Sequence, residues 1–270
     1  MHYDTLMDPT LHARAIEVNW LNLALGHETF AAAGATFVVN RAIPFIHDAN
    51  FVYDATASTP EEIDALLAHA HRVHAHSQSL TFRVDSDTSP ELEARLALDG
   101  APRAGTLVMI LEGDLRGSAM EHDLRPIDDE RGWDAMVELK RASWREDAPK
   151  HGEDPARTEV PDGLTAASRL KSPAVRYTLA YADGKPVGFF NAWEGIDGVG
   201  QVEDLFVLPE HRHRGIATAL IHHCVADARA RGARAVVICS DPSDTPKRMY
   251  AAMGWRPIAV CRQYGVANRE

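Results

Sequence analysis

The chain has 270 residues, enough for one large domain or for two domains of ordinary size. Its composition, 45% hydrophobic and 25% charged, is that of a globular protein with ample material for a core. The net charge is −11, from 28 basic and 39 acidic residues, so there is no basic excess to neutralise phosphates and we expect no nucleic-acid partner. The N-terminus lacks the apolar segment of a signal peptide, and no stretch is long enough to span a membrane. We therefore expect a cytoplasmic protein with no membrane partner.

The cysteines and histidines indicate no metal site. Cys224, Cys239 and Cys261 are odd in number and lack metal-ligand spacing, and the first two fall in apolar patterns typical of buried thiols. A histidine cluster closes one predicted helix, at positions 69, 71, 74 and 76. No cysteine joins it and no helical face collects three of its members, so we expect a solvated or interface helix there.

The first part of the chain predicts mixed helices and strands. Residues 11–33 follow a helical apolar pattern through Phe30. Residues 60–76 predict a helix with Ser58 or Thr59 as its cap and a proline and two glutamates in its first turn. The other predicted elements are strands at 35–40, 50–55, 80–84 and 106–111, a helix at 89–98, and a polar link at 113–121.

The second part predicts the same mixture. Asp183-Gly184 between two apolar runs is a strong hairpin signal, joining strands at 175–181 and 185–193. Residues 145–163 are charged and interrupted by three prolines, which indicates a loop with at most a helical turn. The other predicted elements are strands at 123–125, 200–207, 233–240 and 255–262 and helices at 128–144, 165–170, 215–231 and 244–253. This order predicts an α/β fold, in which helices cover both faces of a mixed sheet.

The stretch from 202 to 231 predicts an anion site. A strand ends at Pro209, a basic loop leads to Gly215, and a helix follows. A helix that begins directly after such a turn directs several unpaired N–H groups and a positive dipole end at one point. Gly215 has no Cβ, so the backbone can approach a phosphate closely, and Ala217 keeps the first turn slim. Arg212 and Arg214 add positive charge.

This stretch resembles the pyrophosphate loop of the GNAT superfamily of N-acetyltransferases, whose motif is Gln/Arg-x-x-Gly-x-Gly/Ala. Farther along, Tyr250-Ala-Ala-Met-Gly254-Trp255 is similar to the family's Tyr-x-x-x-Gly-Phe ending. The resemblance covers roughly residues 122–265. It implies the acyl-CoA N-acyltransferase (GNAT) fold, with acetyl-CoA as co-substrate.

The two parts of the chain are related by one shift. Adding 154 to the residue number brings residues 50–53 onto 204–207, the helix at 60–76 onto 214–230, and the strand at 80–84 onto 234–238. Recurrence of several elements at one offset indicates an internal repeat. We therefore expect two tandem GNAT modules, at residues 1–115 and 122–270.

Under the same shift, the first module lacks the residues expected to bind the cofactor and to catalyse the reaction. Arg212, Gly215 and Ala217 correspond to Ser58, Glu61 and Ile63, and a carboxylate at the second of these positions would repel a pyrophosphate. Residues 203 and 250 correspond to Ala49 and Leu96. We expect the first module to be a degenerate copy without a cofactor site, as in tandem GNAT proteins with one inactive module, mycothiol synthase among them.

The resemblance also implies catalytic roles. Tyr250 stands at the position of the general acid that protonates the leaving thiolate. Glu203 is the candidate general base, and its alternative role is that of a carboxylate that lines the acceptor cleft or pairs with a cation. Other family members place their base two residues earlier, where Gln201 cannot accept a proton usefully. By strand alternation, Asp204 should point to the opposite face.

Cofactor contacts are implied for three segments. Lys247 could meet phosphates or be a solvated helix charge, and where the family often has an asparagine this chain has Ser243 and Asp244. Two strands of the fold splay beside Leu205 and Val207, which leaves backbone groups free for a ligand. The predicted contacts are Leu205, Phe206, Val207, Arg212, His213, Arg214, Gly215, Ile216, Ala217, Thr218, Asp244 and Lys247.

These features predict an N-acetyltransferase in which the amine attacks the acetyl-CoA thioester directly. We expect a small-molecule amine as acceptor, because a second module would narrow the cleft. One alternative is another acyl-CoA or a mycothiol-synthase-like acceptor. Another is a non-catalytic CoA-binding regulatory protein, which would need the phosphate loop but neither Glu203 nor Tyr250. The oligomeric state is left open, a homodimer included.

Overall fold

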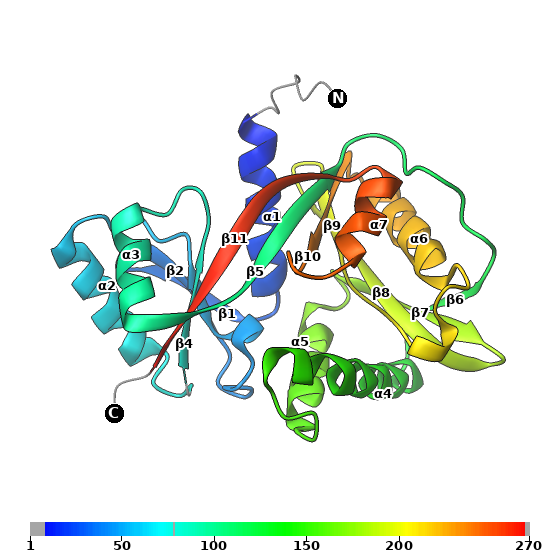
Figure 1. Ribbon diagram of the computed structural model, residues 1–270, viewed down its shortest axis with the longest axis horizontal. Coiled ribbons are helices and arrows are strands. Elements are labelled where there is room, and N and C mark those ends of the chain that lie inside the picture. The colour runs from blue at the N-terminus through cyan, green and yellow to red at the C-terminus, as the bar shows by residue number, and fades with distance from the viewer. Residues whose placement is uncertain (1–8, 78, 268–270) are drawn as a thin grey trace. The chain divides into compact units, whose positions relative to one another are not determined.

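The computed structural model describes residues 9–77 and 79–267, and the chain divides into two compact units (Figure 1). Unit 1 combines residues 1–110 with 239–270, and unit 2 is residues 111–238. No helix in the described part of the chain is long and apolar enough to cross a membrane.

Unit 1 is built on six strands in the order β1-β2-β3-β4-β11-β5. The pair β3–β4 is parallel, and the other neighbouring pairs are antiparallel. The elements are α1 (Pro9–Ala24), β1 (Glu28–Ala32), β2 (Ala35–Val39), the 3-10 turn η1 (His47–Ala49), β3 (Phe51–Tyr53), α2 (Pro60–Val73), β4 (Ser79–Val84), α3 (Pro90–Asp99), β5 (Gly100–Leu111), α7 (Pro246–Met253) and β11 (Arg256–Ala267).

The core of unit 1 lies between its sheet and the helices α2 and α3. Side chains from both helices pack with sheet residues, among them Phe37, Leu66, Phe82 and Leu92. Thr59 caps α2 and Pro60 opens it, as the sequence predicts, because the threonine hydroxyl accepts from the amide of Glu62. The last strand of the chain, β11, supplies Tyr264 to the same core.

The predicted helix at 11–33 is wrong beyond Ala24. Gly26 adopts a left-handed φ of +78°, which ends α1. Phe30 instead belongs to β1, where its ring stacks on Phe37 at a centroid distance of 5.5 Å. A short strand followed by the left-handed Ala33-Gly34 turn into β2 explains the apolar residues that had been assigned to the helix.

Unit 2 has the strand order β10-β9-β8-β7-β6, in which only β9–β10 is parallel. Figure 1 shows α6 on one face of β7 to β9 and the pair α4–α5 on the other. The elements are β6 (Asp123–Pro126), α4 (Glu130–Asp147), η2 (Ala148–His151), α5 (Glu159–Lys171), β7 (Arg176–Ala182), β8 (Lys185–Ile196), β9 (Val199–Val207), η3 (Pro209–His211), α6 (Ile216–Ala230) and β10 (Ala235–Ser240), whose last two residues fall in unit 1.

The predicted loop at 145–163 is more helical than expected. Helix α4 extends to Asp147 and α5 begins at Glu159. Pro161 lies in the first turn of α5, where the missing N–H costs no intrahelical hydrogen bond. The proline therefore opens the helix instead of excluding it.

The repeat is present in the structure as two strand-helix-strand segments, β3–α2–β4 and β9–α6–β10, each with a parallel strand pair. The mixed α/β sheet with helices on both faces is confirmed. The domain limits 1–115 and 122–270 stay a prediction. The compact units divide the chain differently, because residues 239–270 belong to the unit that contains the N-terminal segment.

Candidate functional site

Strand β9 leaves its parallel neighbour part-way along its length. The β9–β10 register runs from Val199 to Val202, whereas β9 continues to Val207. Over residues 203–207, the register of β9 within unit 2 is with β8 alone. Backbone groups on the open side of this segment therefore have no partner strand within unit 2, although the carbonyl oxygen of Val207 already accepts from Arg212.

A β-bulge lies where β9 separates from β10. Phe206 pairs with Phe189 and Glu203 with Asn191, so two β9 residues stand opposite one β8 residue. Within the bulge Asp204 has a φ of +67°, which breaks the strand's alternation. The prediction that Asp204 points away from the Glu203 side is wrong for this reason: both carboxylates reach lysines of the α4–α5 pair.

Glu203 is held by two donors. The amide Nε2 of Gln201 lies 2.9 Å from Glu203 Oε2, and Lys171 Nζ lies 3.5 Å from Oε1. The Glu203 side chain is 18% exposed and that of Lys171 is 10% exposed. Gln201 is fully buried, so the carboxylate is fixed from the protein side while part of it still meets solvent.

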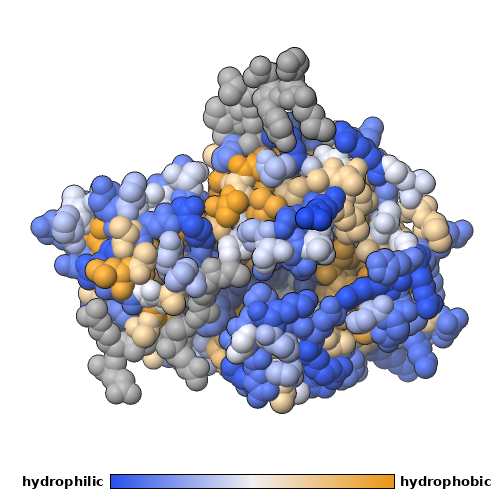
Figure 2. All heavy atoms as spheres, viewed as in Figure 1, coloured by the Kyte–Doolittle hydropathy of each residue, from blue (hydrophilic) through white to orange (hydrophobic). Residues whose placement is uncertain are grey.

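Asp204 forms a second ion pair beside the first. Its carboxylate bonds to Lys140, a buried residue of α4 whose ammonium also lies 5.1 Å from the centroid of the Phe189 ring. Sequence analysis missed both lysines. The signal was available for Lys140, which continues the buried stripe of Trp133 and Met136. Figure 2 shows the hydrophilic outer face of the same helix.

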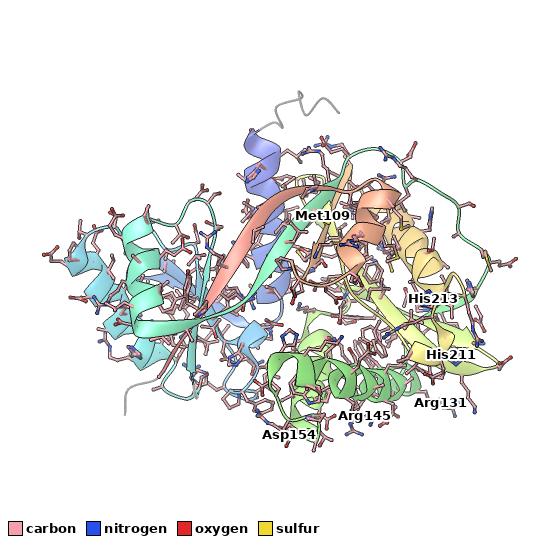
Figure 3. All side chains as sticks on the ribbon, viewed as in Figure 1. Met109, Arg131, Arg145, Asp154, His211 and His213 are labelled. Carbon is pink, nitrogen blue, oxygen red and sulfur yellow. The ribbon has the colours of Figure 1, made fainter. Side chains whose placement is uncertain are left out.

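The loop before α6 presents uncapped amides. Gly215 is the N-cap with a left-handed φ of +83°, and no side chain caps the helix. His213 is also left-handed, and Figure 3 labels it with His211 in this loop. The first N–H groups of a helix have no intrahelical partner, so those of Ile216, Ala217 and Thr218 remain for an anion.

Arg212 links this loop to β9. Its Nε donates to the carbonyl oxygen of Val207 at 2.9 Å, and its terminal nitrogens bond to Glu146 of α4 at 2.9 and 2.6 Å. The guanidinium holds the pKa of the Glu146 carboxyl below its ordinary value. The charge of Arg212 is thus partly compensated within the unit, whereas Arg214 is exposed.

The predicted residues Asp244, Lys247 and Tyr250, which lie just before or within α7, belong to unit 1. Tyr250 is 4% exposed and its ring meets that of Trp255 at 6.0 Å. Burial raises the pKa of Tyr250, and the negative charge of Asp244 adds to the effect, so the phenol stays protonated at neutral pH. Lys247 donates to the carbonyl oxygen of Pro242, and Asp244 Oδ1 accepts from the amide of Thr245 at 2.7 Å.

The corresponding helix of unit 1, α2, is closed by its own carboxylate. Glu62 Oε2 accepts from the amides of Ser58 at 3.0 Å and Thr59 at 3.1 Å. These are donors at the start of α2, where a cofactor pyrophosphate would have to bind. A carboxylate of the protein already accepts from these amides; that this copy lacks a cofactor site stays a prediction.

Two further observations concern metal ligands and the cysteine thiols. Within residues 9–77 and 79–267, no group of three histidine, cysteine or acidic side chains could hold a metal ion. Cys224 and Cys261 are buried thiols whose pKa values burial raises to about 12.

The geometry joins a splayed parallel strand pair, a bulge and an uncapped glycine-started helix in one unit, and the acetyltransferase (GNAT) family matches residues 133–255. The match covers 123 of the chain's 270 residues. The predicted GNAT resemblance of this segment and the GNAT fold are confirmed, and the two-module arrangement agrees with the fold of a solved tandem GNAT protein.

Solved structures agree on the fold. A conserved protein of unknown function from Staphylococcus epidermidis is 15% identical, with 93% of this chain and 98% of that chain covered and a TM-score of 0.67. A GCN5-related N-acetyltransferase from Kribbella flavida is 17% identical, with 94% and 95% covered and a TM-score of 0.64. A tandem GNAT protein from the clavulanic acid biosynthesis pathway is 15% identical, with 87% and 79% covered and a TM-score of 0.60. Among curated proteins, none matches the chain.

Proposed function

We propose that the protein is an N-acetyltransferase that transfers an acetyl group from acetyl-CoA directly to a primary amine of a small molecule. One observation carries the proposal. The edge of β9 that β10 leaves beyond Val202, the carboxylate of Glu203 and the uncapped start of α6 at Gly215 all belong to one unit. Acyl transfer requires an anion site for the donor, a backbone hydrogen-bond partner for the reacting carbonyl, and a base.

The loop residues supply the donor site in this proposal. The backbone amides of His213, Arg214, Gly215, Ile216, Ala217 and Thr218 receive the pyrophosphate of CoA, and Arg212 contributes its side-chain charge, because its own amide donates to the carbonyl oxygen of Pro209 at 3.2 Å. The open edge of β9 at Leu205, Phe206 and Val207 receives the pantetheine amides and the acyl carbonyl. Asp244 and Lys247 are proposed as contacts from the segment before and within α7.

Glu203 and Tyr250 supply the proton transfers. Glu203 takes a proton from the acceptor ammonium, and Gln201 orients its carboxylate through the 2.9 Å hydrogen bond. Tyr250 gives a proton to the departing thiolate, and its raised pKa keeps that proton available. We propose that the enzyme acts in the cytoplasm. Its assembly as a homodimer is left open.

The test is release of free CoA thiol from acetyl-CoA in the presence of small primary amines or of an amine-bearing peptide. We expect turnover with a small amine, and a loss of about 10²- to 10⁴-fold in kcat for Glu203→Gln. The control is Glu138→Gln, which removes a charge from the exposed face of α4. Its turnover should match that of the wild type.

Each other outcome selects an alternative. Binding of acetyl-CoA without turnover of any amine would indicate a CoA-binding regulatory protein. Turnover only with a longer acyl-CoA would show that the acyl donor is not acetyl-CoA. Acetylation of the peptide alone would show that the acceptor is not a small-molecule amine.

A further inference from the structure

We propose that Lys171 is a self-acetylation site: in the absence of an acceptor, its amine attacks the acetyl-CoA bound to the same chain. The inference rests on the proposed function, because it uses the same donor site and the same base. It adds a modified residue and a way to regulate the site.

The first observation is distance. Lys171 Nζ lies 3.5 Å from Oε1 of Glu203, the candidate base. A base must be within hydrogen-bond reach of the proton that it takes, directly or through one water, and this separation is at the edge of direct contact. A primary amine, the nucleophile that the proposed reaction requires, is therefore already beside that base.

The second observation is the position of Glu203 and Lys171 relative to the open edge of β9. Glu203 directly precedes the bulge at Asp204, one residue after the last β9–β10 pair at Val202. The reacting carbonyl of an acyl group at the open edge of β9 would meet this segment. Lys171 reaches Glu203 from α5, which covers the face of the sheet opposite α6, whose N-terminus is the proposed phosphate site (Figure 1).

The third observation is burial. The Lys171 side chain is 10% exposed, so collision with acetyl-CoA in solution is hindered and reaction is favoured only from a bound donor. Lys140 is buried to a similar degree, at 9%, and pairs with the adjacent carboxylate of Asp204. It is a matched lysine whose partner is not the proposed base.

The chemistry balances without a further reactant. Glu203 takes one proton from the Lys171 ammonium, and the neutral amine attacks the thioester carbonyl carbon. The C–N bond forms and the C–S bond breaks, and the second nitrogen proton passes to the departing thiolate. The products are the acetylated lysine, CoA thiol and one proton, which Glu203 returns to solvent. The acetylated side chain carries no charge and lies in the acceptor position, so turnover of an external amine should fall as modification proceeds.

The experiment incubates the full chain with acetyl-CoA and no amine, and maps acetyl groups by peptide mass spectrometry. The chain has five lysines, at positions 140, 150, 171, 185 and 247, which makes the map complete. We expect Lys171 to be acetylated at least tenfold faster than exposed Lys150 and Lys185, which report acetylation by acetyl-CoA in solution. Lys140 should stay unmodified.

Two variants test the roles of Glu203 and Lys171, and a dilution tests whether the reaction is intramolecular. Glu203→Gln should slow acetylation of Lys171 at least tenfold, and Lys171→Arg should remove the dominant mark. The rate constant should not change when the protein is diluted tenfold, because the donor and the amine are in the same chain.

The inference is overturned if acetyl-CoA binds and an external amine is acetylated while Lys171 is marked no faster than Lys150 and Lys185. A rate proportional to protein concentration, or equal marking of Lys140, would also overturn it. Absence of acetyl-CoA binding in calorimetry would instead refute the proposed function, so the two failures are distinguishable.

Discussion

The carboxylate of Glu62 and the backbone of Thr59 form a reciprocal pair at the start of α2. Thr59 N donates to Glu62 Oε2 at 3.1 Å, and Glu62 N donates to the Thr59 hydroxyl at 3.3 Å. At the start of α6, in contrast, Gly215 has no side chain with which to cap the helix. The two corresponding helices therefore differ in whether a side chain of the protein accepts from the amides at their start.

The first prediction concerns this cap and pH. The backbone amides of Ser58 and Thr59 lower the pKa of Glu62 below its ordinary 4.5. A carboxyl with a lowered folded-state pKa stabilises the fold above its unfolded pKa, and that stability is lost as pH falls through the folded value. Urea unfolding at pH 6 and pH 3 should show a larger loss for the wild type than for Glu62→Gln. An equal loss in both would contradict this role.

The second prediction tests the place of β11 in unit 1. A Cβ on Gly100 would lie 2.6 Å from the carbonyl oxygen of Gly265 in β11. Gly100→Val should destabilise the fold by about 1–3 kcal/mol, because the backbone must move to admit the side chain. Gly113→Val is the matched control, since nothing lies within 4 Å of its added Cβ. The measurement is urea denaturation of both variants. Equal free energies of unfolding would show that β11 does not pack against Gly100.

The sequence predicted most elements because their local signals agree with their surroundings. Thr59, Pro60 and the Asp183-Gly184 turn lie where propensity places them. Gly26 lies within the predicted helix at 11–33, although its left-handed backbone ends α1. The place of β11 beside β4 could not be predicted, because strand pairing between distant segments leaves no local pattern.

The candidate site was predictable only in part. The loop around Gly215 has a short-range pattern, and the β9–β10 splay follows from the fold that this pattern indicated. The bulge at Asp204 has no such pattern, and it redirected a side chain that alternation had placed on the other face. Lys171 resembles any helix-end lysine until the packing of α5 brings it to Glu203.

The third prediction concerns Tyr250 as general acid. Burial raises the pKa of Tyr250 above its ordinary 10.0. The phenol of Tyr250 therefore stays protonated, and deprotonation of Tyr250 should cause no fall in kcat between about pH 8 and about pH 10. Tyr250→Phe should lower kcat by about 10²-fold or more while acetyl-CoA affinity is retained. An unchanged kcat would leave the phenol as a packing residue beside Trp255.

The fourth prediction concerns the pair Arg212–Glu146. Glu146→Gln removes the charge that compensates the guanidinium, so acetyl-CoA should bind more tightly. The gain should be at most about fivefold, because an exposed pair contributes about 1 kcal/mol or less. Glu138→Gln, which removes a carboxylate that pairs with Arg141 on the same helix, should leave the affinity unchanged. Calorimetry on both variants is the measurement, and weaker binding by Glu146→Gln would show that the pair organises the loop.

The most direct test of the account is calorimetric titration of acetyl-CoA into the wild type, Gly215→Glu and Gly232→Glu. Both glycines have positive φ, +83° and +112°, and they flank opposite ends of α6, so each replacement adds one charge at a position that favours glycine. We predict one site per chain for the wild type and for Gly232→Glu, and at least hundredfold weaker binding for Gly215→Glu, because a carboxylate at the helix start repels a phosphate. Wild-type affinity in Gly215→Glu, or no binding by the wild type, would contradict the assignment of the donor site to the start of α6.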